Sequence, residues 1–195
     1  MTITHNKLSD QELIVLINRN DETAIAEFLN RYKNKFYTTV FFIVKDHYVA
    51  DDIFQDGCIK IIDLIRKGKY NEDGKFLPWA MRIIRNLAMD YLRHEKRLPK
   101  ITFPDGSDIF SVLQFEDSPV AIDEKQLELA GNKAKEMLLQ LSHEQREVII
   151  LRLFGNLSFN EIAKITNVSV NTALGRMRYG LINLRKLVTE NGVEL

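Results

Sequence analysis

The chain has 195 residues, 45% of them hydrophobic, with 27 basic and 27 acidic side chains. This composition describes a folded globular protein rather than a disordered or fibrous one. Its single cysteine, Cys58, excludes an internal disulfide framework and a Cys-rich zinc site. No apolar run approaches the roughly 20 residues of a membrane span, and the first residues do not resemble a secretory signal. We expect a cytoplasmic protein without membrane insertion.

The first part of the chain predicts three helices. Asp21 can cap a helix whose apolar residues from Ile25 to Phe36 alternate at steps of three and four. A second helix is expected from about Val49 to Gly68, and a third from Pro78 to about His94.

The second helix carries an acidic patch, defined as Asp51, Asp52, Gln55 and Asp56. Acidic side chains at a helix start are favoured by the helix macrodipole, which would make the patch a purely structural feature. A protein-binding face is the alternative, and the pattern alone leaves both open.

The third helix has two unlike sides. A core-facing stripe is predicted for Trp79, Ile83, Ile84, Leu87, Tyr91 and Leu92. The opposite flank holds Arg82, Arg85, Asn86, Met89 and Arg93. Arginine and amide groups on one flank can hold phosphates and contact bases, although a solvated helix face is an equally simple interpretation.

Charge is distributed in blocks along the chain. Residues 75–100 carry a net charge of +5, residues 101–130 of −6, and residues 162–189 of +5. Two basic blocks favour contact with a polyanion. The acidic block contains turn residues and no helical period, which predicts a linker. We therefore expect an all-α protein of two small helical domains, residues 10–94 and 132–190, joined by a flexible acidic linker over residues 95–131.

The second domain predicts a helix-turn-helix. Ser142 with Gln145, and Ser158 with Glu161, have the capping-box spacing, and Ser169 can cap a longer helix. A short helix to Ile165, a tight turn and a longer basic helix make this motif, whose second helix enters the major groove of DNA. The outward face of that helix is predicted to hold Asn171, Thr172, Gly175, Arg176, Arg178 and Tyr179. Asparagine and arginine side chains can pair with base edges.

The sequence gives little support to catalysis. The four histidines are far apart without metal-ligand spacing, Cys58 has no nearby histidine, and there is no glycine-rich phosphate loop. We expect no enzyme activity, no metal site and no cofactor.

Taken together, three stretches resemble the sigma-70 family of bacterial sigma factors, specifically its extracytoplasmic-function group. Residues 50–56 are similar to the family's polymerase-binding helix, residues 76–93 to its promoter-melting helix, and residues 157–186 to its C-terminal helix-turn-helix. Gly57 and Cys58 depart from the family pattern, which has larger apolar residues there, so the acidic helix is expected to pack differently.

The resemblance implies roles for particular residues. Asp51, Asp52, Gln55 and Asp56 would contact RNA polymerase core. Arg82, Arg85, Asn86 and Arg93, with the loop from Lys67 to Lys75, would bind the promoter −10 element as a single strand. Ser169, Asn171, Thr172, Arg176 and Arg178 would bind the −35 element. The acidic linker would run through a basic polymerase channel, although a solvated spacer is the alternative.

The implied partners are RNA polymerase core and promoter DNA, with an anti-sigma factor as a further candidate. A DNA-binding repressor or activator with a sensing or dimerising first domain is the competing interpretation. Such a regulator needs neither the basic third helix nor the acidic patch.

Overall fold

The computed structural model describes residues 8–70, 75–95 and 125–190, with side chains from residue 132 onward in the last range. Every regular element of this part of the chain is an α-helix. The helices are α1 (Asp10–Asn18), α2 (Glu22–Val44), α3 (His47–Arg66), α4 (Phe76–Glu95), α6 (Lys125–Gln140), α7 (His143–Leu153), α8 (Phe159–Thr166) and α9 (Val170–Glu190). The all-α prediction is confirmed.

Local capping explains several helix boundaries. The Asp21 side chain accepts hydrogen bonds from the amides of Thr23 and Ala24, as predicted for the start of α2. Ser158 and Glu161 form a complete capping box at α8. Ser142 accepts from the Gln145 amide at the start of α7. Asn167 ends α8 in the left-handed conformation, which asparagine tolerates better than most residues.

The N-terminal helices α1 to α4 enclose an aromatic-rich core. Phe28, Phe36 and Ile61 are each at most 1% exposed, and the Phe28 ring meets that of Phe76 edge-on at 5.6 Å. Helices α2, α3 and α4 all pack against one another. This arrangement holds α3 and α4 in fixed relative positions, and both carry candidate site residues.

Gly57 determines how closely α3 approaches α4. A Cβ atom at this position would overlap the Cδ1 atom of Ile84. The departure from the family pattern at residue 57 therefore has a structural counterpart, because the missing side chain leaves space that Ile84 occupies. The neighbouring Cys58 is 5% exposed, as expected of a structural thiol.

The buried stripe of α4 differs from the prediction. Its buried residues are Phe76, Ala80, Met81, Ile84 and Ala88, of which only Ile84 was predicted. The other predicted residues, Trp79, Ile83, Leu87, Tyr91 and Leu92, are half-buried and pack against the core. Alanines occupy the centre because neighbouring helices approach most closely there, and the bulky side chains pack around this contact.

The C-terminal helices α7, α8 and α9 form the expected helix-turn-helix with its supporting helix. Ala163 on α8 and Ala173 on α9 are both buried, and these two helices pack against each other. Gly180 lets α9 lie on α7, since a Cβ there would come within 2.9 Å of the Ile149 Cδ1 atom.

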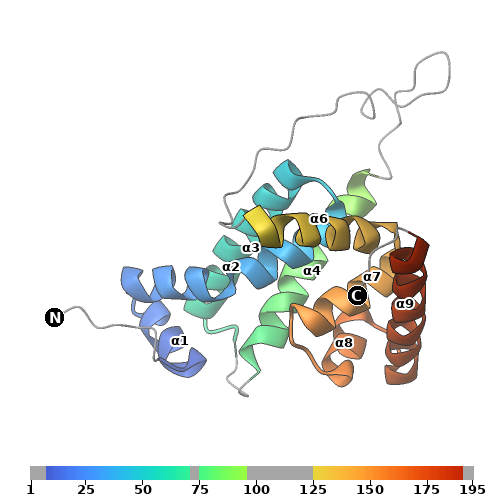
Figure 1. The fold of residues 1–195 in the computed structure, drawn as a ribbon. Coiled ribbons are helices and arrows are strands. Elements are labelled where there is room, and N and C mark those ends of the chain that lie inside the picture. The colour runs from blue at the N-terminus through green and yellow to red at the C-terminus, as the bar shows by residue number, and fades with distance from the viewer. Residues whose placement is uncertain (1–7, 71–74, 96–124, 191–195) are drawn as a thin grey trace, which may run out of the picture.

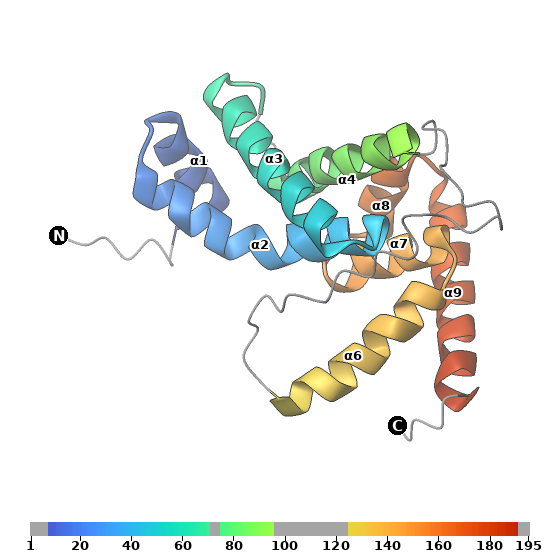
Figure 2. The same ribbon diagram turned by 90° about the horizontal axis from the view of Figure 1, so that it is seen from above.

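The two halves of the molecule are in contact. Figures 1 and 2 show α7 and α8 lying against α2 and α4, with α9 on the outer side and α6 extending along the edge. Helix α6 begins at Lys125, so the last part of the segment predicted as a linker is helical. Residues 96–124 of that segment lie outside the described residues. Among the helices described, none combines the length and apolar character needed to cross a bilayer.

Candidate polymerase and nucleic-acid interfaces

The acidic patch lies on the solvent side of α3. Asp52, Gln55 and Asp56 are exposed and Asp51 is half-buried. The helix begins at His47 with Asp46 as its N-cap, and its first turn contains no acidic residue. Because macrodipole stabilisation falls off within the first turn, helix-start stabilisation does not account for the patch.

The predicted −10 residues on α4 do not all lie on one exposed surface. Arg82, Asn86 and Arg93 are exposed, and Arg93 forms a solvent-exposed ion pair with Asp90 at 3.2 Å. Arg85 instead lies at the boundary between the halves. Its Nε donates to Glu147 Oε1 on α7 at 2.8 Å, and only 13% of its side chain is exposed.

An aromatic cluster holds together the ends of the predicted −10 loop. Tyr70 precedes the undescribed residues 71–74, while Phe76 and Trp79 follow them. The Tyr70 ring lies 4.9 Å from that of Trp79 and 5.5 Å from that of Phe76. The sequence analysis did not predict this cluster. The pattern that could have indicated it is the presence of aromatic residues on both sides of a polar loop that contains glycine.

The helix-turn-helix presents most of its predicted face to solvent. Asn171, Thr172 and Arg178 are exposed, and Arg176 is half-buried. Ser169 caps α9 by accepting from the Thr172 amide at 3.0 Å, and the two hydroxyls lie 2.8 Å apart. A capped helix N-terminus with exposed hydroxyl, amide and guanidinium groups suits both phosphate and base contacts.

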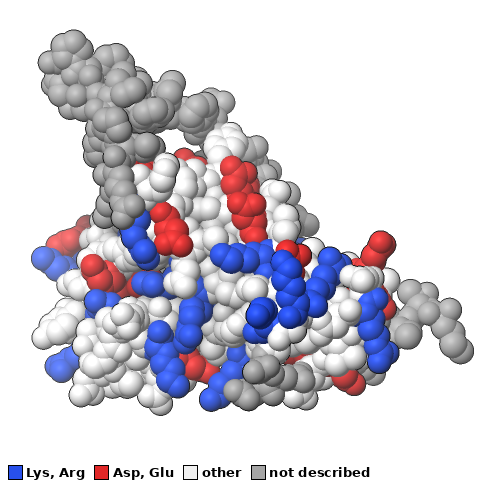
Figure 3. All heavy atoms as spheres, turned by 180° about the vertical axis from the view of Figure 1, so that it is seen from behind, with Lys and Arg blue, Asp and Glu red and all other residues white. Residues whose placement is uncertain are grey.

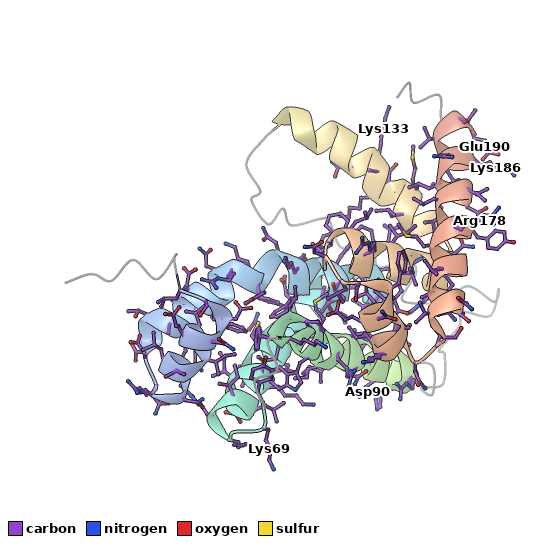
Figure 4. The ribbon with its side chains drawn as sticks, turned by 90° about the horizontal axis from the view of Figure 1, so that it is seen from below. Lys69, Asp90, Lys133, Arg178, Lys186 and Glu190 are labelled. Atoms are coloured by element: carbon purple, nitrogen blue, oxygen red, sulfur yellow. The ribbon has the colours of Figure 1, made fainter. Side chains whose placement is uncertain are left out.

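Helix α9 also exposes apolar side chains. Leu174 and Leu181 are 44% and 38% exposed. They line a shallow groove of about 490 Å³ together with Phe159, Met177, Arg178, Ile182 and Arg185. Figure 4 shows Arg178 and Lys186 projecting outward from α9, while Lys69 lies near the end of α3.

Basic side chains gather on the rear face of the molecule. In Figure 3, Lys and Arg gather across the middle of the rear face, between smaller groups of Asp and Glu. In the described residues, no cluster of three or more His, Cys, Asp or Glu side chains could hold a metal ion. The arrangement suits binding of a polyanion through positive charge and donor groups.

Known proteins match both halves in the same order. Residues 28–98 match the family model of sigma-70 region 2, and residues 132–174 match that of sigma-70 region 4. SigW of Bacillus subtilis, an ECF RNA polymerase sigma factor, is 27% identical over 179 residues, which cover 87% of this chain and 91% of SigW. The chain belongs to the sigma-70 family. Its relatives place it in the extracytoplasmic-function group.

Two further similarities agree with this assignment. CarQ of Myxococcus xanthus, an RNA polymerase sigma factor, is 26% identical over 153 residues, covering 78% of this chain and 82% of CarQ. The structure of CnrH in complex with the cytosolic domain of CnrY covers 93% of this chain and 97% of its own, with a TM-score of 0.64 and 18% identity. This last similarity concerns the fold. As a sigma factor, the chain binds RNA polymerase core and directs promoter recognition and transcription initiation.

Proposed function

We propose that the exposed acidic patch on α3 is the main contact with RNA polymerase core. Asp52, Gln55 and Asp56 are exposed beyond the first turn of the helix, where they contribute little to helix stability. This is the observation that carries the proposal, because exposed charge that is not used within the fold is available to a partner of opposite charge.

For the −10 element, the proposed contacts are Arg82, Arg85, Asn86 and Arg93 with the loop from Lys67 to Lys75. The exposed Arg82, Asn86 and Arg93 on α4 support this role, since single-stranded nucleic acid is held by positive charge and stacking, whereas Arg85 is paired with Glu147 in this structure. The half-buried Tyr70 and Trp79 add aromatic surface beside the loop.

For the −35 element, the proposed contacts are Ser169, Asn171, Thr172, Arg176 and Arg178 on α9 and its cap. Their exposure and their position at the start of a helix-turn-helix recognition helix support this assignment. The acidic residues between 101 and 130 are proposed to occupy a basic channel of the polymerase before nucleic acid does.

The remaining assignments follow from this function. The chain is proposed to act in the cytoplasm, with core polymerase and DNA, and without catalysis of its own. Because CnrH was solved with CnrY, and RpoE of Bartonella quintana with the anti-sigma factor NepR, an anti-sigma factor is a proposed partner here as well.

Co-purification with core polymerase tests the central proposal. We expect Asp52→Lys combined with Asp56→Lys to abolish association with core, while the helical content and duplex DNA binding persist, because exposed substitutions usually cost little stability. The control is Asp63→Lys with Glu136→Lys, which changes the net charge equally at exposed acids outside the patch. Wild-type core affinity in the first variant would refute the proposed contact.

A further inference from the structure

The imidazole of His47 lies where side chains of three helices meet. His47 is the first residue of α3 and is half-buried. Its ring centroid lies 4.4 Å from that of Phe41 on α2, and its Nδ1 atom lies 2.9 Å from the Tyr37 hydroxyl of the same helix. The Lys135 ammonium of α6 lies 3.1 Å from its Nε2 atom. Both ring nitrogens therefore have a partner, and the polymerase and DNA contacts proposed above do not include this side chain.

The two partners define the protonation state of the imidazole. An ammonium group carries donors and no acceptor, so Nε2 of His47 accepts the hydrogen bond from Lys135. A neutral imidazole has one donor nitrogen and one acceptor nitrogen, so Nδ1 carries the proton and donates to the Tyr37 oxygen. The contact with Lys135 thus requires a neutral His47.

Protonation of His47 would break this contact. Both nitrogens of a protonated imidazole are donors, so Nε2 would lose its ability to accept from Lys135. Two positive charges would also face each other across the present 3.1 Å. Histidine is the side chain that ordinarily changes charge between about pH 5 and pH 8. Acidification within this range should therefore separate Lys135 from His47.

Other charges around His47 act in both directions. In the described residues they come from Tyr37 of α2, Asp46 and Asp51 at the start of α3, Lys135 of α6, and Tyr91 and Glu95 of α4, which lie near Asp46. Burial, followed by the charges of Asp51 and Asp46, holds the pKa of Tyr37 above its ordinary value. The carboxylates favour a protonated imidazole, whereas Lys135 and the positive end of the helix dipole favour a neutral one.

The end of α6 is held by contacts of a different kind. Met137 and Leu138 are buried, and α6 packs against α9. The Leu139 carbonyl accepts from Lys45 Nζ at 3.1 Å and from Arg146 Nη1 at 3.0 Å. None of these groups is a histidine. Lys135 precedes them in the helix, so loss of its contact would release the first part of α6 and leave the end of the helix in place.

We infer that His47 is a pH-sensitive tether for α6. When neutral it binds Lys135, whose ammonium also lies 4.4 Å above the Phe41 ring, and so holds α6 against α2 and α3. When protonated it releases the first part of α6. The tethered state binds one proton fewer, so falling pH weakens it by up to about tenfold per pH unit. Since α6 begins at Lys125, the tether also fixes where the acidic block of residues 101–130 ends.

Distance distributions from pulsed electron paramagnetic resonance test the tether on the full chain. The only native cysteine is buried, so cysteines that replace exposed Lys60 on α3 and exposed Lys133 on α6 can carry a pair of nitroxide labels. Figure 4 shows Lys133 projecting from α6. We expect one narrow distribution at pH 8 and a broader, longer one at pH 5. The ratio of released to tethered protein should change by up to about tenfold per pH unit.

Substitutions at both partners separate the tether from other effects of pH. His47→Gln should give the same distribution at both pH values, because an amide does not titrate in this range. His94→Gln, at an exposed histidine of α4, should keep the full response. Lys135→Gln should hold the contact at both pH values, since an amide can donate to a neutral imidazole and accept from a protonated one. Lys135→Ala should release α6 already at pH 8.

Two results would overturn the tether in a folded protein. One is a wild-type distribution that stays the same from pH 8 to pH 5, and the other is a His47→Gln variant that responds to pH as the wild type does. Helical circular dichroism is followed over the same range, because a loss of helical signal in step with the distance change would show general acid unfolding and would also overturn a local tether. If His47→Gln does not fold, a full pH response in Lys135→Gln refutes the inference in its place.

Discussion

Arg176 has two features that suit sequence reading in the major groove. It is half-buried on α9, and its charge lies near Glu144 on α7. The Glu144 pKa is held below its ordinary value, chiefly by a hydrogen bond from its own backbone amide and also by the Ser142 hydroxyl, His143 and Arg176. A guanidinium partly fixed by its surroundings loses less entropy on binding than a fully mobile one.

We therefore expect Arg176→Ala to weaken binding to a −35 duplex by about 1–3 kcal/mol and to relax the preference at one base pair. Titrations against a set of singly substituted duplexes measure both effects. Lys186→Ala, an exposed change farther along α9, should leave base preference intact. An equal loss on every duplex would assign Arg176 to a phosphate, and no loss would remove it from the interface.

Cys58 gives a second prediction at this scale. Burial raises the pKa of its thiol from 9.0 to about 12, so the thiol stays protonated near neutral pH. We expect a disulfide reagent to modify native protein slowly at pH 8 and to react rapidly once urea unfolds it. Above pH 9 the unfolded thiol ionises before the folded one, so this group lowers the free energy of unfolding as pH rises toward 12. Rapid modification of the native protein would contradict its burial.

At the scale of the helix, sequence reasoning succeeded where the signal was local. The Ser158–Glu161 capping box spans four residues, and the structure contains both of its hydrogen bonds. It was incomplete where packing decides, because it placed Ile84 in the buried stripe of α4 but missed the buried alanines. Ala80 and Ala88 are fully buried because α4 approaches its neighbours closely, and a count of bulky apolar residues cannot show that.

The close approach of α3 and α4 makes a testable pair of glycine substitutions. Gly57→Ala should lower the free energy of unfolding by about 1–3 kcal/mol, because its Cβ overlaps Ile84 in a packed interior. Gly175→Ala is the matched control on α9. Its Cβ would meet no atom within 4 Å, so the change should raise stability by up to about 1 kcal/mol through helix propensity. Urea unfolding measures both, and a neutral Gly57→Ala would show that Ile84 can move aside freely.

At the scale of the whole molecule, the contact between the halves was beyond sequence reasoning. The sequence placed Arg85 on an outward flank and gave Glu147 no role. Their pairing depends on how α7 docks against the N-terminal half, and no local spacing or periodicity encodes that. The family resemblance, by contrast, was available from sequence because each of its three stretches is contiguous and their order is preserved.

The charge arrangement of the whole chain yields a final prediction. The block from 101 to 130 carries a net charge of −6 between two basic blocks, and we propose that it occupies a basic channel of the polymerase. Replacing Asp105, Asp108, Glu116 and Asp117 by Asn or Gln preserves length and polarity while removing four negative charges. If negative charge contributes to the fit, these substitutions should weaken binding to core or alter the yield of short initial transcripts.

Salt dependence distinguishes that role from a solvated spacer. Added salt screens charge interactions between the block and the channel, so the difference between variant and wild type should shrink as ionic strength rises. Titrations with core and transcription assays at several salt concentrations provide the measurement. Asp63→Lys combined with Glu136→Lys shifts the net charge by the same four units at exposed positions, and it therefore controls for the change in net charge. Equal binding and equal transcript yields across the salt series would mean that the block acts only as a spacer.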